Sequence, residues 1–258
     1  MTTEVSPLSS TLIPPLTIYD KMAPLDLIFF SGTDLISIVV KDVEQLGCGF
    51  KDVSHVGIVV TSEILPSIKE LVPGKKYIWE STSSLVVPCT GTPFVPDVER
   101  RTSRFGVQIR PLEDVVSTYD GKVYWAQLKT NPWLGLNTQI TIISKVEQLH
   151  LSYKATHYES NPISLLSSAM RLMRPVRNLI DYTLICGHYI LNAMRITSGP
   201  WTQLNAEELT VFCSEFVTIV YQTLDILQQD PSVVPYNTTP VNMLHAMPGL
   251  LNPVVSLK

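Results

Sequence analysis

Charged residues are scarce in this chain, and neither sign predominates. There are 19 lysines and arginines against 23 aspartates and glutamates, so charged residues make up 16% of the 258 positions and the formal net charge is −4. A protein that binds nucleic acid through its phosphates needs a basic excess, which this composition lacks. Hydrophobic residues make up 45% of the chain, unlike the composition of a disordered protein. We therefore expect a globular protein with a sizeable core and no nucleic-acid partner.

Cysteine is also rare, and the four cysteines are far apart in the sequence. Cys48, Cys89, Cys186 and Cys213 include no CxxC pair. Structural zinc sites normally use closely spaced ligands, and disulfide frameworks use a regular set of cysteines. The sequence therefore predicts no metal, no cofactor and no disulfide framework, and it fits a reducing compartment.

The chain shows neither a secretory leader nor an uninterrupted membrane-spanning run. Its first residues lack a basic segment followed by a continuous apolar one, and Pro14 and Pro15 interrupt the apolar stretch there. Residues 176–195, VRNLIDYTLICGHYILNAMR, are apolar, but charged residues break them well below the roughly 18 uninterrupted residues that a membrane span needs. We expect a buried helix at residues 176–195, no export and a cytoplasmic location.

Two kinds of hydrophobic pattern divide the chain into a strand-rich first half and a helix-rich second half. Residues 1–20 are rich in proline, serine and threonine, which predicts an extended arm. Short β-branched and aromatic runs predict strands at residues 24–32, 54–62, 75–83, 105–112 and 122–129. Apolar residues three and four positions apart predict helices at residues 33–46 and through most of the chain from residue 137. The pattern predicts an α+β fold, with one domain over residues 21–258.

The segment TVFCSEFVTIVYQ, residues 210–222, places Cys213 where a helix is expected to begin. One face of that helix would be apolar, formed by Phe216, Val217, Val220, Tyr221 and Leu224. In the first turn, unpaired N–H groups and the helix dipole lower a thiol pKa from about 8.5 toward the roughly 3.5–7.5 range of reactive cysteines. The same N–H groups can stabilise an oxyanion. A lone cysteine in this position is more often inert packing, so a nucleophilic role requires a base.

One of the five histidines stands out as a candidate base. His150, His157, His188 and His245 fit surface or satisfied core positions. His55 instead opens the strand HVGIVV, beside a glycine that leaves room around its ring.

A carboxylate that could orient His55 lies in the next predicted strand. The turn at residues 73–74, Pro-Gly, makes the two strands a plausible antiparallel pair. Glu80 in YIWEST lies among apolar residues, where an unpaired carboxylate would be costly. Such a carboxylate can fix the tautomer of a catalytic histidine. The alternative is a glutamate at the strand edge that faces water.

Several short motifs occur in an order that resembles a known family. The chain carries, in sequence, DLIFF, SHVGIVV, YIWES, YDGKVYWAQL, YESNP, FCSEFV and TPVNML. Over roughly residues 24–247 it resembles the circularly permuted branch of the NlpC-type papain-fold cysteine hydrolases, specifically the YiiX/YaeF-like group, which includes proteins of large DNA viruses. In that branch the histidine strand precedes the cysteine helix, as His55 precedes Cys213 here. The resemblance implies that Cys213 is the nucleophile, His55 the general base and Glu80 the residue that orients His55.

The resemblance also suggests three cleft residues and shows two departures from the family. Asp26, Tyr158 and Ser214 are candidates for shaping the substrate cleft, although a structural role is favoured for Asp26 and Tyr158. The family usually has a glycine before the aspartate that precedes the first strand, but Leu25 stands there, which puts the geometry of that turn in question. The segment between Tyr158 and Cys213 is longer than a minimal member needs, which implies a helical insertion at about residues 160–205 that serves as a lid, a cap or a partner surface.

Three functions are compatible with these residues. The leading expectation is a cysteine hydrolase that cleaves an amide bond of a peptide or peptide-like substrate through an acyl-enzyme. The second is a thiol-dependent lipid acyltransferase or phospholipase-like enzyme, since related permuted proteins resemble lecithin:retinol acyltransferase; this alternative is compatible with peripheral lipid contact. It ranks lower because those enzymes tend to use a second histidine where this chain has Glu80. The third is a structural protein, such as a virion component, on the same scaffold.

Overall fold

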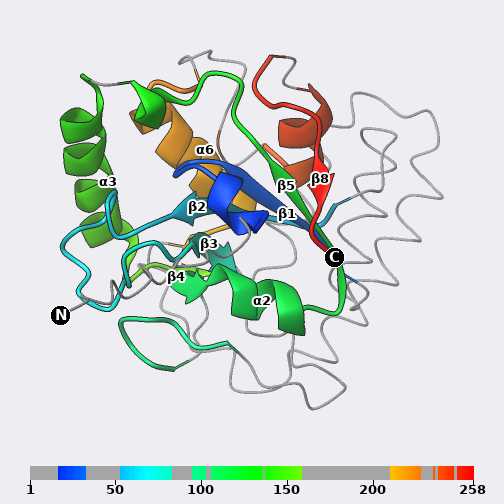
Figure 1. Cartoon of the computed structure of the whole chain (residues 1–258), viewed down its shortest axis with the longest axis horizontal. Coiled ribbons are helices and arrows are strands. Elements are labelled where there is room, and N and C mark those ends of the chain that lie inside the picture. Colours follow the sequence, from blue (N-terminus) through cyan, green and yellow to red (C-terminus); the bar gives the residue numbers. More distant parts are fainter. Residues whose placement is uncertain are drawn as a thin grey trace, which may run out of the picture.

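The computed structural model describes residues 17–32, 53–82, 95–102, 106–135, 137–158, 210–227, 235, 238–246 and 249–258. The expected helices at residues 33–46 and 176–195, the insertion at about residues 160–205 and most of the expected arm lie outside the described residues. Within the described part, a six-stranded antiparallel sheet packs against helices (Figure 1). The α+β prediction is confirmed.

The sheet is a four-strand meander extended beyond its first strand. Its order is β4-β3-β2-β1-β5-β8. The strands are β1 (Leu27–Gly32), β2 (His55–Val60), β3 (Tyr77–Thr82), β4 (Gly106–Pro111), β5 (Gly121–Ala126) and β8 (Val255–Ser256). The expected antiparallel pairing of the second and third strands is confirmed, because Ile58 is paired with Trp79 and Val60 with Tyr77. All five expected strands are present, whereas β8 was not expected.

The two faces of the sheet are covered by different helices. Successive side chains of a strand point to opposite faces, and both faces of β2 are apolar. Helices α3 (Gln139–Tyr153) and α6 (Cys213–Thr223) share a core with Val56, Ile58 and Val60. Helix α2 (Leu112–Thr118) shares a second core with Val59, on the other face. The remaining short elements are η1 (Tyr19–Lys21), η2 (Pro132–Leu134), the parallel pair β6 (His157–Tyr158) and β7 (Thr210–Val211), and the π-helical turn η5 (Asn242–Ala246).

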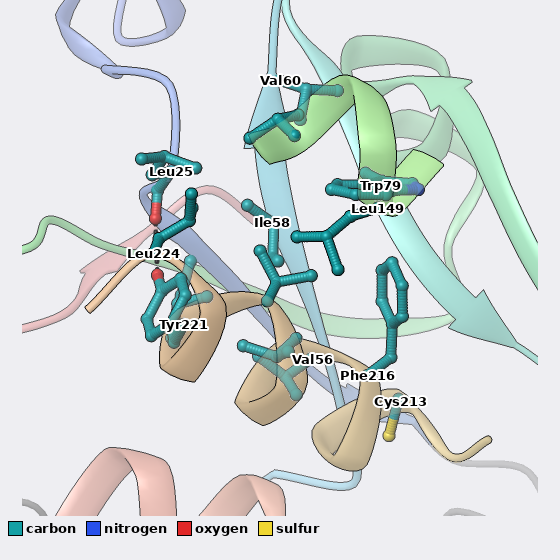
Figure 2. Close-up of a cluster of buried hydrophobic side chains, with 14 of the residues drawn as sticks. Leu25, Val56, Ile58, Val60, Trp79, Leu149, Cys213, Phe216, Tyr221 and Leu224 are labelled. Atoms are coloured by element: carbon teal, nitrogen blue, oxygen red, sulfur yellow. Dashed lines mark hydrogen bonds between the residues drawn. The ribbon is translucent and has the colours of Figure 1, made fainter. Parts of the chain in front are cut away.

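Helix α6 is held against the sheet along its apolar face. The residues expected on that face are all buried: Phe216, Val217, Val220, Tyr221 and Leu224. The Phe216 ring meets Trp79 of β3 edge-on, with ring centroids 4.8 Å apart. Five residues after Phe216, the Tyr221 hydroxyl donates a 2.5 Å hydrogen bond to the carbonyl of Leu25 (Figure 2). The sequence therefore specifies both the helix and the face that it buries.

Leu25 occupies a backbone conformation that normally favours glycine. Its φ is 75°, in the left-handed region that costs a residue with a side chain roughly 1–2 kcal/mol. The Leu25 side chain is fully buried in the larger core. The turn into β1 therefore has a glycine-type geometry with a leucine in it, and apolar burial outweighs the backbone strain.

Candidate active site

The first turn of α6 presents the Cys213 sulfur beside strand β2. Phe212, the residue before the helix, is extended, with φ −78° and ψ 168°, and its N–H donates to the Glu215 carboxylate at 3.1 Å. The Glu215 side chain thereby satisfies the N–H group of the residue that precedes the helix. Cys213 is 5% exposed, and the backbone N–H groups of Val56 and Ser214 help to lower the pKa of its thiol. The expected position of the thiol at a helix start is confirmed.

His55 is the partner of this thiol. It is the first residue of β2, lies opposite Phe30 of β1 and packs against the Phe30 ring at a centroid distance of 5.3 Å. Burial alone would lower the pKa of His55. The charge of Cys213, its hydrogen bond to the ring and the interactions with Glu80 outweigh burial and raise the pKa from 6.5 to about 10.

The same pairing lowers the pKa of the Cys213 thiol, whereas it raises the pKa of His55. Burial alone would raise the pKa of the Cys213 thiol, but the positive charge of His55, its hydrogen bond and the two backbone N–H groups lower it. The two shifts favour a thiolate beside an imidazolium at neutral pH.

Glu80 holds the second nitrogen of His55. Its Oε2 lies 2.5 Å from His55 Nε2, which leaves Nδ1 of the ring for the thiol. Glu80 is 0% exposed, so the alternative of a water-facing glutamate is wrong. Burial alone would raise its pKa, but the charges of Arg110 and His55 lower it from 4.5 to about 2. Glu80 is therefore an ionised acceptor, which fixes the orientation of the ring.

Gly57 creates the space that brings Glu80 next to His55. A Cβ built on Gly57 would lie 2.6 Å from Cγ1 and Cδ1 of Ile78 and 3.0 Å from Cβ of Glu80. Both neighbours belong to β3 and are completely buried. The glycine after the histidine is therefore required by the close approach of β2 and β3.

Sequence reasoning missed Arg110, which contacts the other oxygen of Glu80. Arg110 Nε and Nη2 lie 2.8 Å and 2.5 Å from Glu80 Oε1, and the arginine side chain is 12% exposed. In the β3–β4 register, Gln108 lies opposite Glu80, and Arg110 is two residues further on. Alternation along β4 therefore puts Arg110 on the face of Glu80. That signal exists only once the register of the two strands is known.

Gln108 was also missed, and its surroundings are unusual. It is 2% exposed, and within the described structure neither its amide nitrogen nor its amide oxygen has a hydrogen-bond partner. An unpaired buried amide costs roughly 1–3 kcal/mol.

Asp26 lies away from the thiol. It precedes β1 by one residue, four residues before Phe30, which pairs with His55, and this spacing corresponds to about 13 Å along a strand. Its carboxylate accepts hydrogen bonds from Trp125 Nε1 at 3.0 Å and from the Leu128 N–H at 3.1 Å, among others. Burial raises its pKa. Asp26 braces the end of the sheet, in line with the structural role favoured from the sequence.

The other two cleft candidates adjoin Cys213 in different ways. Ser214 follows it in α6, is buried, and donates its hydroxyl to the Thr238 carbonyl at 2.7 Å. The backbone of Tyr158 in β6 is paired with Val211, two residues before the cysteine. The position of the Tyr158 ring lies outside the described features.

The other described histidines do not belong to this constellation. His150 of α3 is buried, with Nε2 2.9 Å from a Glu99 oxygen, and burial is the main reason that its pKa is lowered. His157 and His245 lie in β6 and η5. His188, Cys48, Cys89 and Cys186 lie outside the described residues.

Two searches of the described residues found nothing further. No group of three or more His, Cys, Asp or Glu side chains in this part of the chain could hold a metal ion. No helix there is long and apolar enough to cross a membrane.

The comparisons with known proteins assign no family. No protein-family model matches the sequence, and no curated protein matches it either. The features of the chain that bear on its function are therefore the positions of Cys213, His55, Glu80 and Arg110.

Proposed function

We propose that the protein is a cysteine hydrolase that cleaves an amide bond in a peptide or peptide-like substrate. The observation that carries this proposal is the contact between His55 and Glu80, together with the opposite shifts that His55 and Cys213 cause in each other's pKa. A nucleophile, a base and a group that orients the base are the components that nucleophilic catalysis requires.

The chemistry follows from the charges of these groups. The Cys213 thiolate attacks the carbonyl carbon, and first-turn N–H groups of α6 stabilise the oxyanion that forms. The His55 imidazolium then gives its proton to the leaving amine, which breaks the C–N bond and leaves a thioester. A water molecule loses a proton to His55, attacks the thioester and releases the acid. This step regenerates the Cys213 thiolate and the His55 imidazolium. Glu80 remains ionised throughout and stabilises the imidazolium.

We also propose that the fold is the permuted papain-like arrangement. In support, the histidine strand β2 precedes the cysteine helix α6 in the chain, and α6 packs on β2 and β3 of an antiparallel sheet. A thiol nucleophile must remain reduced, so we place the proposed activity in a reducing compartment such as the cytoplasm, or in a virion if the chain is viral.

An acyl-trapping experiment tests the hydrolase. The protein is incubated with activated peptide amides and, separately, with phospholipid vesicles, and acyl adducts are located by mass spectrometry of peptides. We expect an acyl group on Cys213 from the peptide substrate, no adduct in Cys213→Ala, and unchanged labelling in Cys89→Ala as a matched cysteine control. An adduct formed only from phospholipid would replace the amidase proposal with the acyltransferase. Undiminished labelling of Cys213→Ala would remove Cys213 as the nucleophile.

A further inference from the structure

We propose that Arg110 is a positioning residue of this site: it keeps Glu80 as a charged hydrogen-bond acceptor and thereby keeps His55 in the form that pairs with the Cys213 thiolate. The inference rests on the proposed function, because it assigns Arg110 a part in the same catalytic series. Arg110 need not touch the substrate.

The geometry assigns one oxygen of Glu80 to each neighbour. Arg110 donates from both Nε and Nη2 to Oε1, while His55 Nε2 lies against Oε2. Two donors on a rigid guanidinium restrict rotation of the carboxylate more than a single donor does. The plane of Glu80, and with it the direction of the His55 ring, is therefore set from β4 as well as from β3.

Burial makes the charge of Arg110 necessary. Glu80 has no exposed surface, and Arg110 and His55 are only 12% and 17% exposed in their side chains. The four groups form a series of alternating charge, with Arg110 positive, Glu80 negative, His55 positive and Cys213 negative. Without Arg110 the buried series would carry an excess negative charge, which is costly in a region of low dielectric.

The charged groups that act within this series come from β2, β3, β4 and α6. Arg110 of β4 and His55 of β2 act on Glu80, and Cys213 of α6 and Glu80 of β3 act on His55. On the α2 side, the acidic residues Glu113 and Asp114 belong to the first turn of the helix. Arg110 is thus the cation that balances the negative charge of Glu80 at Oε1, the oxygen that His55 does not contact.

Loss of Arg110 exchanges donor and acceptor in the hydrogen bond between Glu80 and His55. A buried Glu80 that lacks its cation takes up a proton and becomes a donor to His55 Nε2. The neutral ring then carries its hydrogen on Nδ1, facing the sulfur, and cannot hold the proton of the thiol. Incorrect histidine tautomers of this kind reduce catalysis severely when a triad carboxylate is neutralised.

The test is the pH dependence of Cys213 alkylation by iodoacetamide, a step in which the thiolate displaces iodide from carbon. It is followed for Cys213 alone by peptide mass spectrometry from about pH 5 to 10. In the wild-type protein we expect Cys213 to be alkylated at pH values well below the ordinary thiol pKa of about 8.5. In Arg110→Met we expect the rate at pH 6 to fall by roughly 100-fold as the thiol pKa approaches about 8.5, with rates converging near pH 10. Arg110→Lys, which keeps the charge but not the paired donors, should restore part of the rate at pH 6.

The outcomes separate this inference from the proposed function. If wild-type Cys213 itself has an ordinary thiol pKa, the proposed hydrolase fails, and the inference fails with it. If the wild-type thiol is reactive at low pH and Arg110→Met has the same profile, only the inference fails. An equal loss of rate at every pH would indicate a merely structural arginine and would also overturn it.

A second variant covers the case in which Arg110→Met does not fold. The double variant Glu80→Gln/Arg110→Met removes both charges and so avoids a buried unpaired carboxylate. We expect it to fold and to show the high-pH alkylation profile. A wild-type profile in this variant would refute the role of the Glu80–Arg110 pair.

Discussion

Gly57→Ala tests whether the close approach of β2 and β3 builds the site. The new Cβ would lie 2.6 Å from two carbons of Ile78, whereas carbon atoms in contact are normally about 3.5–4.0 Å apart. Ile78 is completely buried, so the closely packed core around it resists a rotation of its side chain. The strands must therefore separate locally by about 1 Å, because the contact has to lengthen by that amount.

This displacement has consequences for stability and for the site. Overpacking of a core typically costs about 1–3 kcal/mol. A loss of about 2 kcal/mol with an m-value of about 3 kcal/mol/M lowers the urea midpoint by about 0.7 M. The 2.5 Å contact between Glu80 and His55 would lengthen to about 3.5 Å, beyond hydrogen-bond range. We therefore expect slower alkylation of Cys213 at pH 6.

The assays are urea unfolding and Cys213 alkylation, with two comparison variants. Gly74→Ala is the matched control, because nothing lies within 4 Å of its Cβ; its φ of 81° predicts a cost of about 1 kcal/mol with no effect on alkylation. Gly57→Ala combined with Ile78→Ala removes both clashing carbons, so it should regain part of the alkylation rate. Wild-type stability and alkylation in Gly57→Ala would refute the reasoning.

Three further predictions concern stability. Leu25→Gly and Leu25→Ala should both destabilise the protein, but the glycine variant should be more stable than the alanine variant by about 1 kcal/mol in urea unfolding, because glycine relieves the strain of φ 75°; the usual order, with alanine more stable, would contradict the strained turn. Gln108→Met should raise the free energy of unfolding by about 1 kcal/mol, since it removes an unpaired buried amide; a loss of stability would show that the amide has a partner. The pKa of Glu80, lowered from 4.5 to about 2, contributes stability that is fully present above about pH 4.5 and is lost as the pH falls toward 2. The raised pKa of His55 contributes stability that is present below pH 6.5 and lost as the pH rises through about 10. The lowered pKa of Cys213 contributes stability that is fully present above its ordinary value of 9.0 and is lost as the pH falls. The two slopes oppose each other between about pH 6.5 and 9, so wild-type stability should decline less steeply there than the stability of Cys213→Ala; equal pH profiles would argue against the coupled pair.

Strong local patterns made much of the fold predictable. Alternating β-branched and aromatic residues specified five strands, and the apolar spacing after Cys213 specified the buried face of α6. The pairing of His55 with Glu80 was also accessible, because β2 and β3 are consecutive strands, and consecutive strands are usually neighbours in a sheet. These features depend on a regular period or on strands that follow each other in the chain.

The missed features depend on contacts between distant segments. Arg110 reaches Glu80 across 30 positions, through a register that the sequence does not state. The two-residue strand β8 is too short for a recognisable period and exists because it pairs with β5. The strain at Leu25 is tolerated only because the assembled core buries its side chain.

Hydrogen bonds near both ends of α6 restrict how Cys213 can move. At one end the Ser214 hydroxyl donates to the Thr238 carbonyl, and at the other the Tyr221 hydroxyl donates to the carbonyl of Leu25. A helix shift of one residue, about 1.5 Å along the axis, would break both bonds at once. The Cys213 sulfur is therefore held at a fixed position relative to the sheet, and under the proposed function the substrate would have to move to the sulfur.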